Sequence, residues 1–345
     1  MPLRRRDRHR ELDRRIERFE REHQRHREDE DRPLQSRDAQ PRGEHHDGDA
    51  DDDLDLRAPL RPYQVRDALE RETERPQQAH TASVADIGIL PRDAVARRLN
   101  RELFVALGST AAVLLQMAHP LVAAGVDQHS DFRRDPFGRF HRTANTSLDA
   151  VFGTTARARR ALRRIDARHV SVQGTAEDGR RYRARDPQLL LWVQATLVLT
   201  SLRWYELVAG RLPPSDRQRY WDEGKVFARE LGVPDDLFPR TIGDLERYER
   251  DMLVTAAVPD TTGRTVARIV LHPFAVVPDA LYWPTDVITA GLLPPALRAA
   301  FELRWGTAER LFFRFVIHAL RVWRALAPKW LAFVPHARLY DERVR

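Results

Sequence analysis

The most constraining feature of this sequence is an uncharged helix near its centre. Asp186-Pro187 is a strong helix start, because an aspartate can accept free backbone amides and proline suits the first helical position. The following segment, Leu189–Leu202, contains no charged residue, whereas a surface helix carries charges on one face. We therefore expect this helix to be buried on nearly every side, with the chain packed around it.

A second uncharged segment, Leu103–Val126, is long enough to cross a bilayer. Small and polar residues interrupt it, and they include Gly108, Gln116 and His119-Pro120. These residues favour a buried core helix over a membrane span. Because proline cannot donate a backbone hydrogen bond, the helix should break near His119-Pro120. His119 should have a structural role, such as capping the end of the broken helix, and the alternative is that it lines a pocket.

Proline and capping patterns predict further helices. One begins at Asp135-Pro136 and ends near Gly153, and another covers Arg157–Arg168. Further helix signals are a capping-box pattern over Ser215–Gln218, a cap over Thr241–Asp244 and a long helix over Thr307–Leu326. His318 is on the apolar face of that long helix, where it should lie in the core or line a pocket. Val170–Val172 and Tyr182 alternate around Gly179, which predicts a hairpin with positive φ at the glycine. The fold class is therefore mainly α, with a helical core and one small β-hairpin.

Composition divides the chain into three parts. Residues 1–60 form a mixed-charge, low-complexity tail with few aromatic or β-branched residues, which predicts a disordered N-terminal extension. Residues 61–89 are a transition segment, and residues 90–340 form one helical domain. Met1–Arg32 is charged throughout, so it does not resemble a signal peptide. We expect a cytoplasmic protein, with membrane association as an alternative.

The net charge of +7 comes almost entirely from arginine, since lysine occurs only at Lys225 and Lys329. This composition is typical of a coding bias toward arginine and alanine, and nucleic acid is not an expected partner. The chain has no cysteine, which excludes disulfides, thiolate metal sites and cysteine nucleophiles. The G-x-S-x-G, H-E-x-x-H, P-loop, dinucleotide-binding and paired E-x-x-H patterns are also absent.

His169 is the sharpest candidate for a functional residue, because it lies where a basic helix meets the predicted hairpin, beside the uncharged helix. Imidazole is a common metal ligand and the proximal ligand of many haem irons. A structural hydrogen bond is the alternative. Arg139 and Thr143 are one helical turn apart, so they share a face. Arg139 could anchor an anionic group and Thr143 could hydrogen-bond bound oxygen or peroxide, unless they are an ordinary surface pair.

Several segments together resemble the MpaB-type oxygenases, a family that includes the latex clearing proteins, which are rubber oxygenases. These segments are LLQMAHPLVAAGV with HSDF, DPFGRFHRT with VFGT, HVSVQG, and YRARDPQLLLWVQATLV. The resemblance covers about Arg97 to Trp305. It implies a globin-like helical core, a haem b cofactor, and dioxygen-dependent cleavage of carbon–carbon double bonds in isoprenoid-like chains.

Carried over by motif, His169 matches the proximal haem ligand, and Arg139 and Thr143 match an arginine and a threonine on the other side of the haem. Latex clearing proteins have a lysine before that threonine. Here the position is Arg142, which stays charged and cannot ligate iron, but which can join Arg139 in pairing with haem propionates. Many relatives have a histidine where this chain has Gln194, and the glutamate proposed as a base in the rubber enzymes has no counterpart that we can place.

The predicted function is that of a haem b-dependent oxygenase. His169 is the iron ligand, Arg139 and Arg142 bind the cofactor, and Arg139 and Thr143 are the catalytic candidates. The substrate would be a hydrophobic, terpenoid or polyisoprenoid-like molecule, with dioxygen as the second substrate. The alternative is a helical protein that binds haem or a lipid without turnover.

Overall fold

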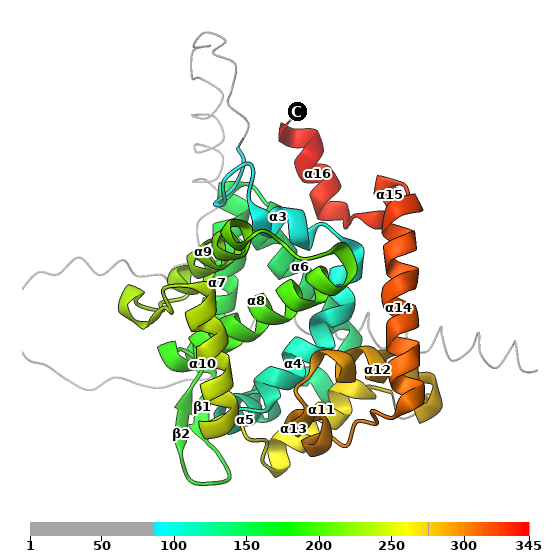
Figure 1. The fold of residues 1–345 in the computed structure, drawn as a ribbon. Coiled ribbons are helices and arrows are strands. Elements are labelled where there is room, and N and C mark those ends of the chain that lie inside the picture. The colour runs from blue at the N-terminus through cyan, green and yellow to red at the C-terminus, as the bar shows by residue number, and fades with distance from the viewer. Residues whose placement is uncertain (1–85, 275, 345) are drawn as a thin grey trace, which may run out of the picture. The chain divides into compact units, whose positions relative to one another are not determined.

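The computed structural model describes residues 86–274 and 276–344, which belong to the second of two units into which the chain divides, residues 80–345. That part of the chain is mainly helical with one small antiparallel hairpin, which confirms the predicted fold class there (Figure 1). The predicted tail over residues 1–60, and residues 61–85 of the predicted transition segment, lie outside the described residues.

The helices and strands follow one another in a simple order, in which η marks a short 3-10 helix. The first half contains α3 (Val95–Asn100), η1 (Leu103–Gly108), α4 (Ser109–Met117), α5 (Pro120–His129), η2 (Asp131–Arg133), α6 (Pro136–Phe152), α7 (Thr155–Ser171), β1 (Gln173–Thr175), β2 (Arg181–Arg183) and α8 (Pro187–Ala209). The second half contains α9 (Pro214–Glu230), η3 (Asp235–Leu237), α10 (Ile242–Thr255), α11 (Thr261–Leu271), η4 (Asp279–Leu281), α12 (Trp283–Leu292), α13 (Pro295–Ala300), α14 (Thr307–Leu326), α15 (Lys329–Ala332) and α16 (Pro335–Val344).

Helix α8 lies at the centre of the core, as its uncharged sequence predicts. Asp186 is the N-cap and accepts the amide of Gln188 at 2.8 Å, with Pro187 in the first turn. The helix packs against α4, α9, α10, α12 and α14. Its fully buried side chains include Trp192, Ala195, Leu199, Leu202 and Trp204. Burying one large apolar side chain stabilises a fold by roughly 1.5–3 kcal/mol, so this helix is a major source of stability.

The C-terminal end of α8 lies beyond its predicted end at Leu202. The helix continues to Ala209 and stops before Gly210, which has a φ of 94°. The first charged residue, Arg203, lies inside the helix and pairs with Glu249 of α10, with one contact at 2.9 Å. A charged residue does not end a helix, so α8 continues to the glycine.

The uncharged segment Leu103–Val126 is not one helix. It forms η1, α4 and most of α5, and the arms Leu103–Met117 and Pro120–His129 meet at 107°. Among the described residues, no single helix is long and apolar enough to cross a membrane, and this bent pair qualifies only by length and composition. The expectation of a buried core segment is confirmed in α4, where Leu114 and Leu115 are fully buried.

The predicted break at His119-Pro120 is confirmed. His119 is the N-cap of α5, and its Nδ1 accepts the amide of Leu121 at 3.3 Å. The ring is 5% exposed, and burial, helped by the charge of Arg180, lowers its pKa from 6.5 to about 4. His119 therefore stays neutral in the folded protein and has the structural role that the sequence predicts.

The lowered pKa of His119 predicts a loss of stability in acid. The unfolded chain binds this proton near pH 6.5, but the folded chain binds it only near pH 4. The stabilisation is therefore complete above pH 6.5 and declines as the pH falls toward 4. Between pH 7 and pH 4.5 the free energy of unfolding should fall in the wild type. In His119→Asn the fall should be smaller by about 2–3 kcal/mol. Urea denaturation at both pH values measures this difference, since asparagine keeps a cap acceptor but does not titrate. Equal pH dependence in the two proteins would contradict the prediction.

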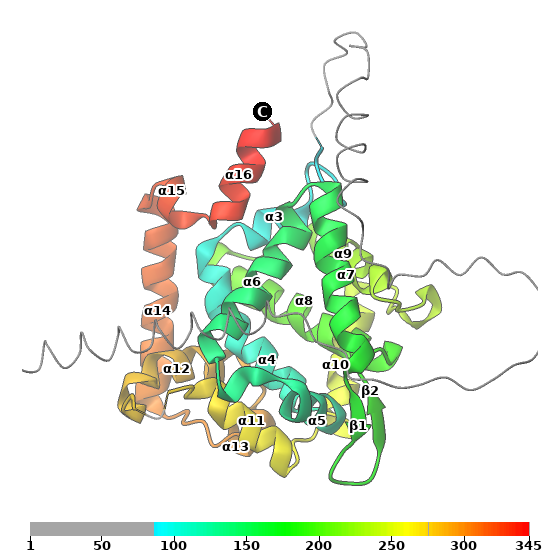
Figure 2. The same cartoon turned by 180° about the vertical axis from the view of Figure 1, so that it is seen from behind.

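Helices α6 and α7 pack on each other and form a pair (Figures 1 and 2). Asp135 caps α6 by accepting the amide of Gly138 at 2.8 Å, which confirms the helix predicted from Asp135-Pro136. Helix α7 is longer than predicted. The strand expected at Val170–Val172 is wrong there, because Val170 and Ser171 form the last turn of α7, and the Ser171 hydroxyl donates to the Arg168 carbonyl at 3.2 Å.

The hairpin begins after that turn, with Gly174 of β1 opposite Tyr182 of β2. Gly179 has a φ of 84°, as the turn prediction requires. The Tyr182 hydroxyl donates to Gln128 Oε1 at 2.6 Å, so the hairpin is held against α5. At Gly174, an added Cβ would lie 2.8 Å from the Tyr182 oxygen, so this close approach requires glycine.

Three predictions in the second half of the chain have different outcomes. The capping box of Thr241 and Asp244 is confirmed at the start of α10, and the bounds of α14 are as predicted. The capping box over Ser215–Gln218 is wrong, because α9 begins at Pro214 without a side-chain cap. The prediction that His318 lies in the core or lines a pocket is also wrong, since this residue is exposed on α14. Helix α14 has one buried apolar side, with Phe313 and Ile317, and one exposed apolar side, with Leu311 and Phe315, so the pattern did not reveal which side faces the core.

Candidate functional site

His169 lies in the last turn of α7 and is half-buried. Its Nδ1 atom is buried and has no hydrogen-bond partner among the described residues. Burial lowers the pKa of His169, Asp166 opposes this effect, and Arg185 adds to it. The neutral imidazole is therefore favoured, and neutral imidazole is the form that binds metals. The structural hydrogen bond that would have been the simplest role for this ring is not present at Nδ1.

An ion pair next to His169 was not anticipated from the sequence. Arg185 Nε donates to Asp166 Oδ1 at 2.8 Å, and Arg185 Nη2 contacts the second carboxylate oxygen. Asp166 lies one turn before His169 on α7, and Arg185 directly precedes the N-cap residue of α8. The pair therefore joins the last turn of α7, which carries His169, to the first turn of the central helix. The hydrogen bond to Arg185 also lowers the pKa of Asp166, which keeps it ionised.

Arg139 lies on α6 and is partly buried. Burial lowers its pKa first, and the positive charges of Arg142 and Arg168 lower it further. Within the described part of the chain its guanidinium has no acceptor or carboxylate partner. A partly buried arginine beside two other arginines favours an anion, because an anion would accept its hydrogen bonds and relieve the repulsion.

Arg142 and Thr143 are the other two predicted residues on α6, and both are exposed. Arg142 Nη1 pairs with Asp135 Oδ2 at 2.9 Å, so its charge is partly balanced. The Thr143 hydroxyl makes no side-chain hydrogen bond within the described residues. The structure thus places Arg139, Arg142 and Thr143 on one helix and His169 on the helix that packs against it.

The α6–α7 pair packs mainly on α3, η2 and α16, and it makes no extensive contact with α4 or α8 among the described elements. On the α4–α8 pair, Gln116 donates to Thr196 at 3.2 Å, which brings one face of each helix together. Elsewhere on α8, Val193 is half-buried and Leu197 is 42% exposed, although most of the helix is buried. The described residues leave these two apolar side chains partly uncovered.

Gln194, which replaces the histidine of many relatives, has a packing role. Its side-chain amide donates to the Gly224 carbonyl of α9 at 3.0 Å. A Cβ added at Gly224 would lie 2.9 Å from the Val198 side chain, so α8 and α9 approach closely here. Gln194 therefore stabilises the contact between α8 and α9.

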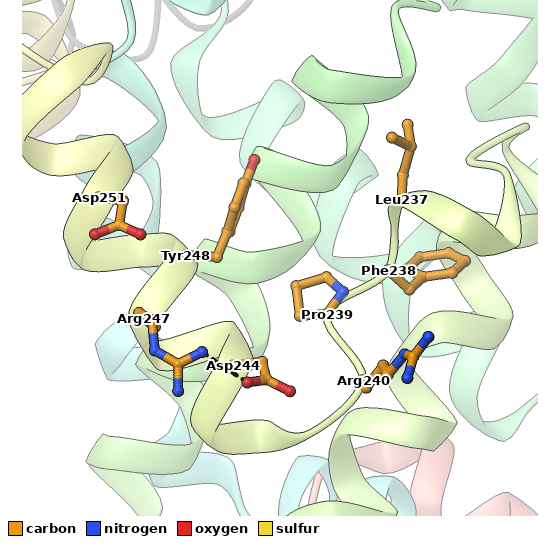
Figure 3. Close-up of a pocket in the computed structure, with 8 residues that line it drawn as sticks. All are labelled: Leu237, Phe238, Pro239, Arg240, Asp244, Arg247, Tyr248 and Asp251. Atoms are coloured by element: carbon orange, nitrogen blue, oxygen red, sulfur yellow. Dashed lines mark hydrogen bonds and ion pairs between the residues drawn. The ribbon is translucent and has the colours of Figure 1, made fainter.

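Two hollows lie away from the predicted residues. One, of about 390 Å³, lies beside α10 (Figure 3) and is lined by Leu237, Phe238, Pro239, Arg240, Asp244, Arg247, Tyr248 and Asp251. The other, of about 380 Å³, is lined by Arg203, Glu206, Leu207, Arg211, Gly291 and Leu292. In the first, Asp244 and Arg247 pair at 2.8 Å. Neither hollow contains His169, Arg139, Arg142 or Thr143, so the predicted site does not coincide with either.

The described residues offer few protein ligands for a metal ion. Among the described residues, no three histidine, cysteine, aspartate or glutamate side chains converge in a way that could hold a metal ion. A metal at His169 would therefore have no more than two such protein ligands from this part of the chain. That donor set suits a metal that arrives with donor atoms of its own.

Comparison with known proteins gives the family. The family model described as "ER-bound oxygenase mpaB/B'/Rubber oxygenase, catalytic domain" matches residues 96–322. An uncharacterized protein of Mycobacterium bovis and one of Mycobacterium tuberculosis are each 29% identical to this chain over 248 residues, which is 68% of this chain and 95% of each relative. The match with the family model confirms the resemblance seen in the sequence motifs. Since it spans most of the chain, this protein belongs to the mpaB and rubber oxygenase family and is an oxidoreductase of the oxygenase type.

Proposed function

We propose that this protein is a haem b-dependent oxygenase that uses dioxygen to oxidise a hydrophobic, isoprenoid-like substrate. One observation carries the proposal. Two adjacent helices, α6 and α7, present a buried imidazole nitrogen without a hydrogen-bond partner and a partly buried guanidinium without an acceptor, within the described residues.

These two groups fit haem b. The cofactor brings its own porphyrin nitrogens, so a single imidazole is enough to hold it, and its propionates require cationic partners. His169 supplies the imidazole and Arg139 the cation, with Arg142 and Arg168 adding positive charge nearby. When bound, haem supplies an iron centre at which dioxygen can be activated.

The protein residues have separate tasks in this proposal. His169, kept neutral by burial, holds the iron. The Asp166–Arg185 pair positions the turn that carries the ring, so these two are positioning residues. Thr143 offers a hydroxyl that can donate a hydrogen bond on α6, the helix that also carries Arg139. The unpaired guanidinium of Arg139 holds the negative end of the cofactor and thereby orients it.

The apolar face of α8 supports a hydrophobic substrate. Val193 and Leu197 lie on the uncharged helix, and the Asp166–Arg185 pair joins the start of this helix to the turn that carries His169. A substrate without charges would gain from contact with such a surface, because removing apolar area from water is favourable. A polyisoprenoid-like chain meets this condition, and dioxygen is the second substrate.

Arg139→Gln tests the assignment of the cofactor. We expect the variant to bind haem about 10- to 100-fold more weakly than the wild type, because the propionates lose their desolvated partner. Titration of the purified full chain with haem, followed by absorbance, gives the dissociation constants. Arg163→Gln, an exposed arginine of α7, is the matched control and should bind as the wild type does.

The same preparation tests turnover. We expect oxygen consumption when an unsaturated isoprenoid is added to the haem-loaded protein. A wild type that takes up no haem and consumes no oxygen would rule out the proposed function. Haem binding without oxygen consumption would favour the alternative, a non-catalytic haem- or lipid-binding protein.

A further inference from the structure

Helix α14 has two apolar faces, and only one of them is covered. Phe313 and Ile317 are buried on the inner face, and the Phe313 ring lies 6.0 Å from that of Trp204. Figures 1 and 2 show α14 at the edge of the described part of the chain, next to α12 on its inner side. A surface helix normally has polar residues on its outer side. The outer side of α14 departs from this pattern.

The outer side of α14 continues into α15 and is strongly apolar. We define the α14 outer face as six exposed apolar side chains: Leu311 (59% exposed), Phe315 (64%), Val322 (57%), Trp323 (39%), Leu326 (79%) and Trp330 (65%). Leu311, Phe315, Val322 and Leu326 are spaced by four, seven and four residues, so they form one stripe along the helix. The stripe contains no charged side chain. Two exposed tryptophans lie beside it, and tryptophan is typical of membrane–water interfaces.

The charges beside this stripe are almost all positive. The segment from α14 to α15 carries the basic residues Arg310, Arg314, Arg321, Arg324 and Lys329. Its one acidic residue, Glu309, is engaged with the Gly306 amide at 2.8 Å and with Trp283. Within the described residues only Arg324 forms an ion pair, with Glu102 at 3.2 Å. Four basic side chains therefore lie next to an exposed apolar stripe without a carboxylate partner.

We propose that the α14 outer face docks on an anionic lipid bilayer, with α14 lying in the plane of the membrane surface. The apolar stripe would enter the boundary between headgroups and acyl chains, while the arginines would reach the lipid phosphates. A second copy of the chain is a poorer occupant, because a symmetric interface would bring together two sets of unpaired cations. This surface lies on different helices from His169 and Arg139, so the inference does not depend on the proposed function.

Vesicle binding of the full chain tests this inference. We expect the wild type to sediment with vesicles of phosphatidylcholine containing phosphatidylglycerol, and to bind pure phosphatidylcholine much more weakly. Each basic side chain near an anionic surface strengthens binding roughly fivefold, so Arg310→Gln with Arg314→Gln should weaken it by about 25-fold in low salt. Phe315→Glu with Leu326→Glu should weaken it at least 10-fold for both lipid mixtures.

Matched variants distinguish binding through this surface from nonspecific binding to vesicles. Arg159→Gln with Arg160→Gln removes two exposed arginines of α7, and Val254→Glu charges a side chain of α10 that is 80% exposed. Both should bind vesicles as the wild type does, and all variants should keep the wild-type urea midpoint because the replaced side chains are exposed. Binding that persists undiminished in Phe315→Glu with Leu326→Glu would overturn the proposal. So would a concentration-dependent dimer, without vesicle binding, that the same substitutions disrupt, since the face would then be an interface between copies.

Discussion

Replacement of His169 by alanine should reduce haem affinity by more than 100-fold and oxygen consumption to below about 1% of the wild type. The loss of an outer partner of a metal ligand usually costs 10- to 100-fold in affinity, so the loss of the ligand itself should cost more. The buried Nδ1 atom and the lowered pKa mean that the folded protein already holds this ring in its metal-binding form. Absorbance titration with haem and oxygen-electrode measurements provide the two readouts.

His141→Ala is the control for this experiment. His141 is exposed on α6 and its ring contacts Asn145 at 3.2 Å, so its removal should change neither readout. Imidazole added to His169→Ala should restore part of the absorbance spectrum, because it can occupy the space left by the side chain. If His169→Ala binds haem as tightly as the wild type, another residue must hold the iron and the assignment of His169 is wrong.

Replacement of Trp204 by alanine should lower the free energy of unfolding by about 3–5 kcal/mol, the usual cost of removing a large buried aromatic side chain. Trp204 of α8 is fully buried, and its ring lies 6.4 Å from that of Phe104 and 6.0 Å from that of Phe313. Its Nε1 also donates to the Phe104 carbonyl at 2.8 Å, so the variant leaves both a cavity and an unpaired carbonyl.

Urea denaturation at pH 7 measures this loss. Trp330→Ala is the matched control, because Trp330 is 65% exposed and its removal should change the free energy of unfolding by less than about 0.5 kcal/mol. Equal destabilisation by the two substitutions would show that α8 is not the centre of the core. Trp204 also supports Phe313 on the inner side of α14, so the central helix and the proposed docking helix are expected to lose stability together.

Local patterns predicted much of the helical framework. The Asp186 cap, the Thr241–Asp244 capping box and the break at His119-Pro120 all depend on hydrogen bonds within one turn of the chain, so neighbouring residues suffice to determine them. The same is true of the positive φ at Gly179, which only the local turn requires. His169 became a candidate from its place beside the predicted hairpin, and Arg139 and Thr143 became candidates from their helical spacing. Motif resemblance then gave them roles at a haem, and the family match supports the family but does not test those roles.

Wrong predictions occurred where distant contacts matter. Val170 and Ser171 have the composition of a strand, yet α7 continues through them. Helix α8 continues past its predicted end to Ala209, and Arg203 in this extension pairs with Glu249, which is 46 residues away. His318 is exposed because α14 packs against α8 and α12 through its Phe313 side, a choice that a helix with two apolar sides does not reveal.

By itself, the sequence determined a helical chain with an uncharged centre, its main helix starts and its family. These features depend on backbone hydrogen bonds within a turn, on total apolar content, or on residues that stand in a fixed order. Only the tertiary structure decided that His169 has an unpaired buried nitrogen, that Asp166 and Arg185 join α7 to α8, and that Arg139 lacks an acceptor within the described residues. Burial and ion pairing are properties of neighbours in space, and the packing of separate helices creates those neighbours.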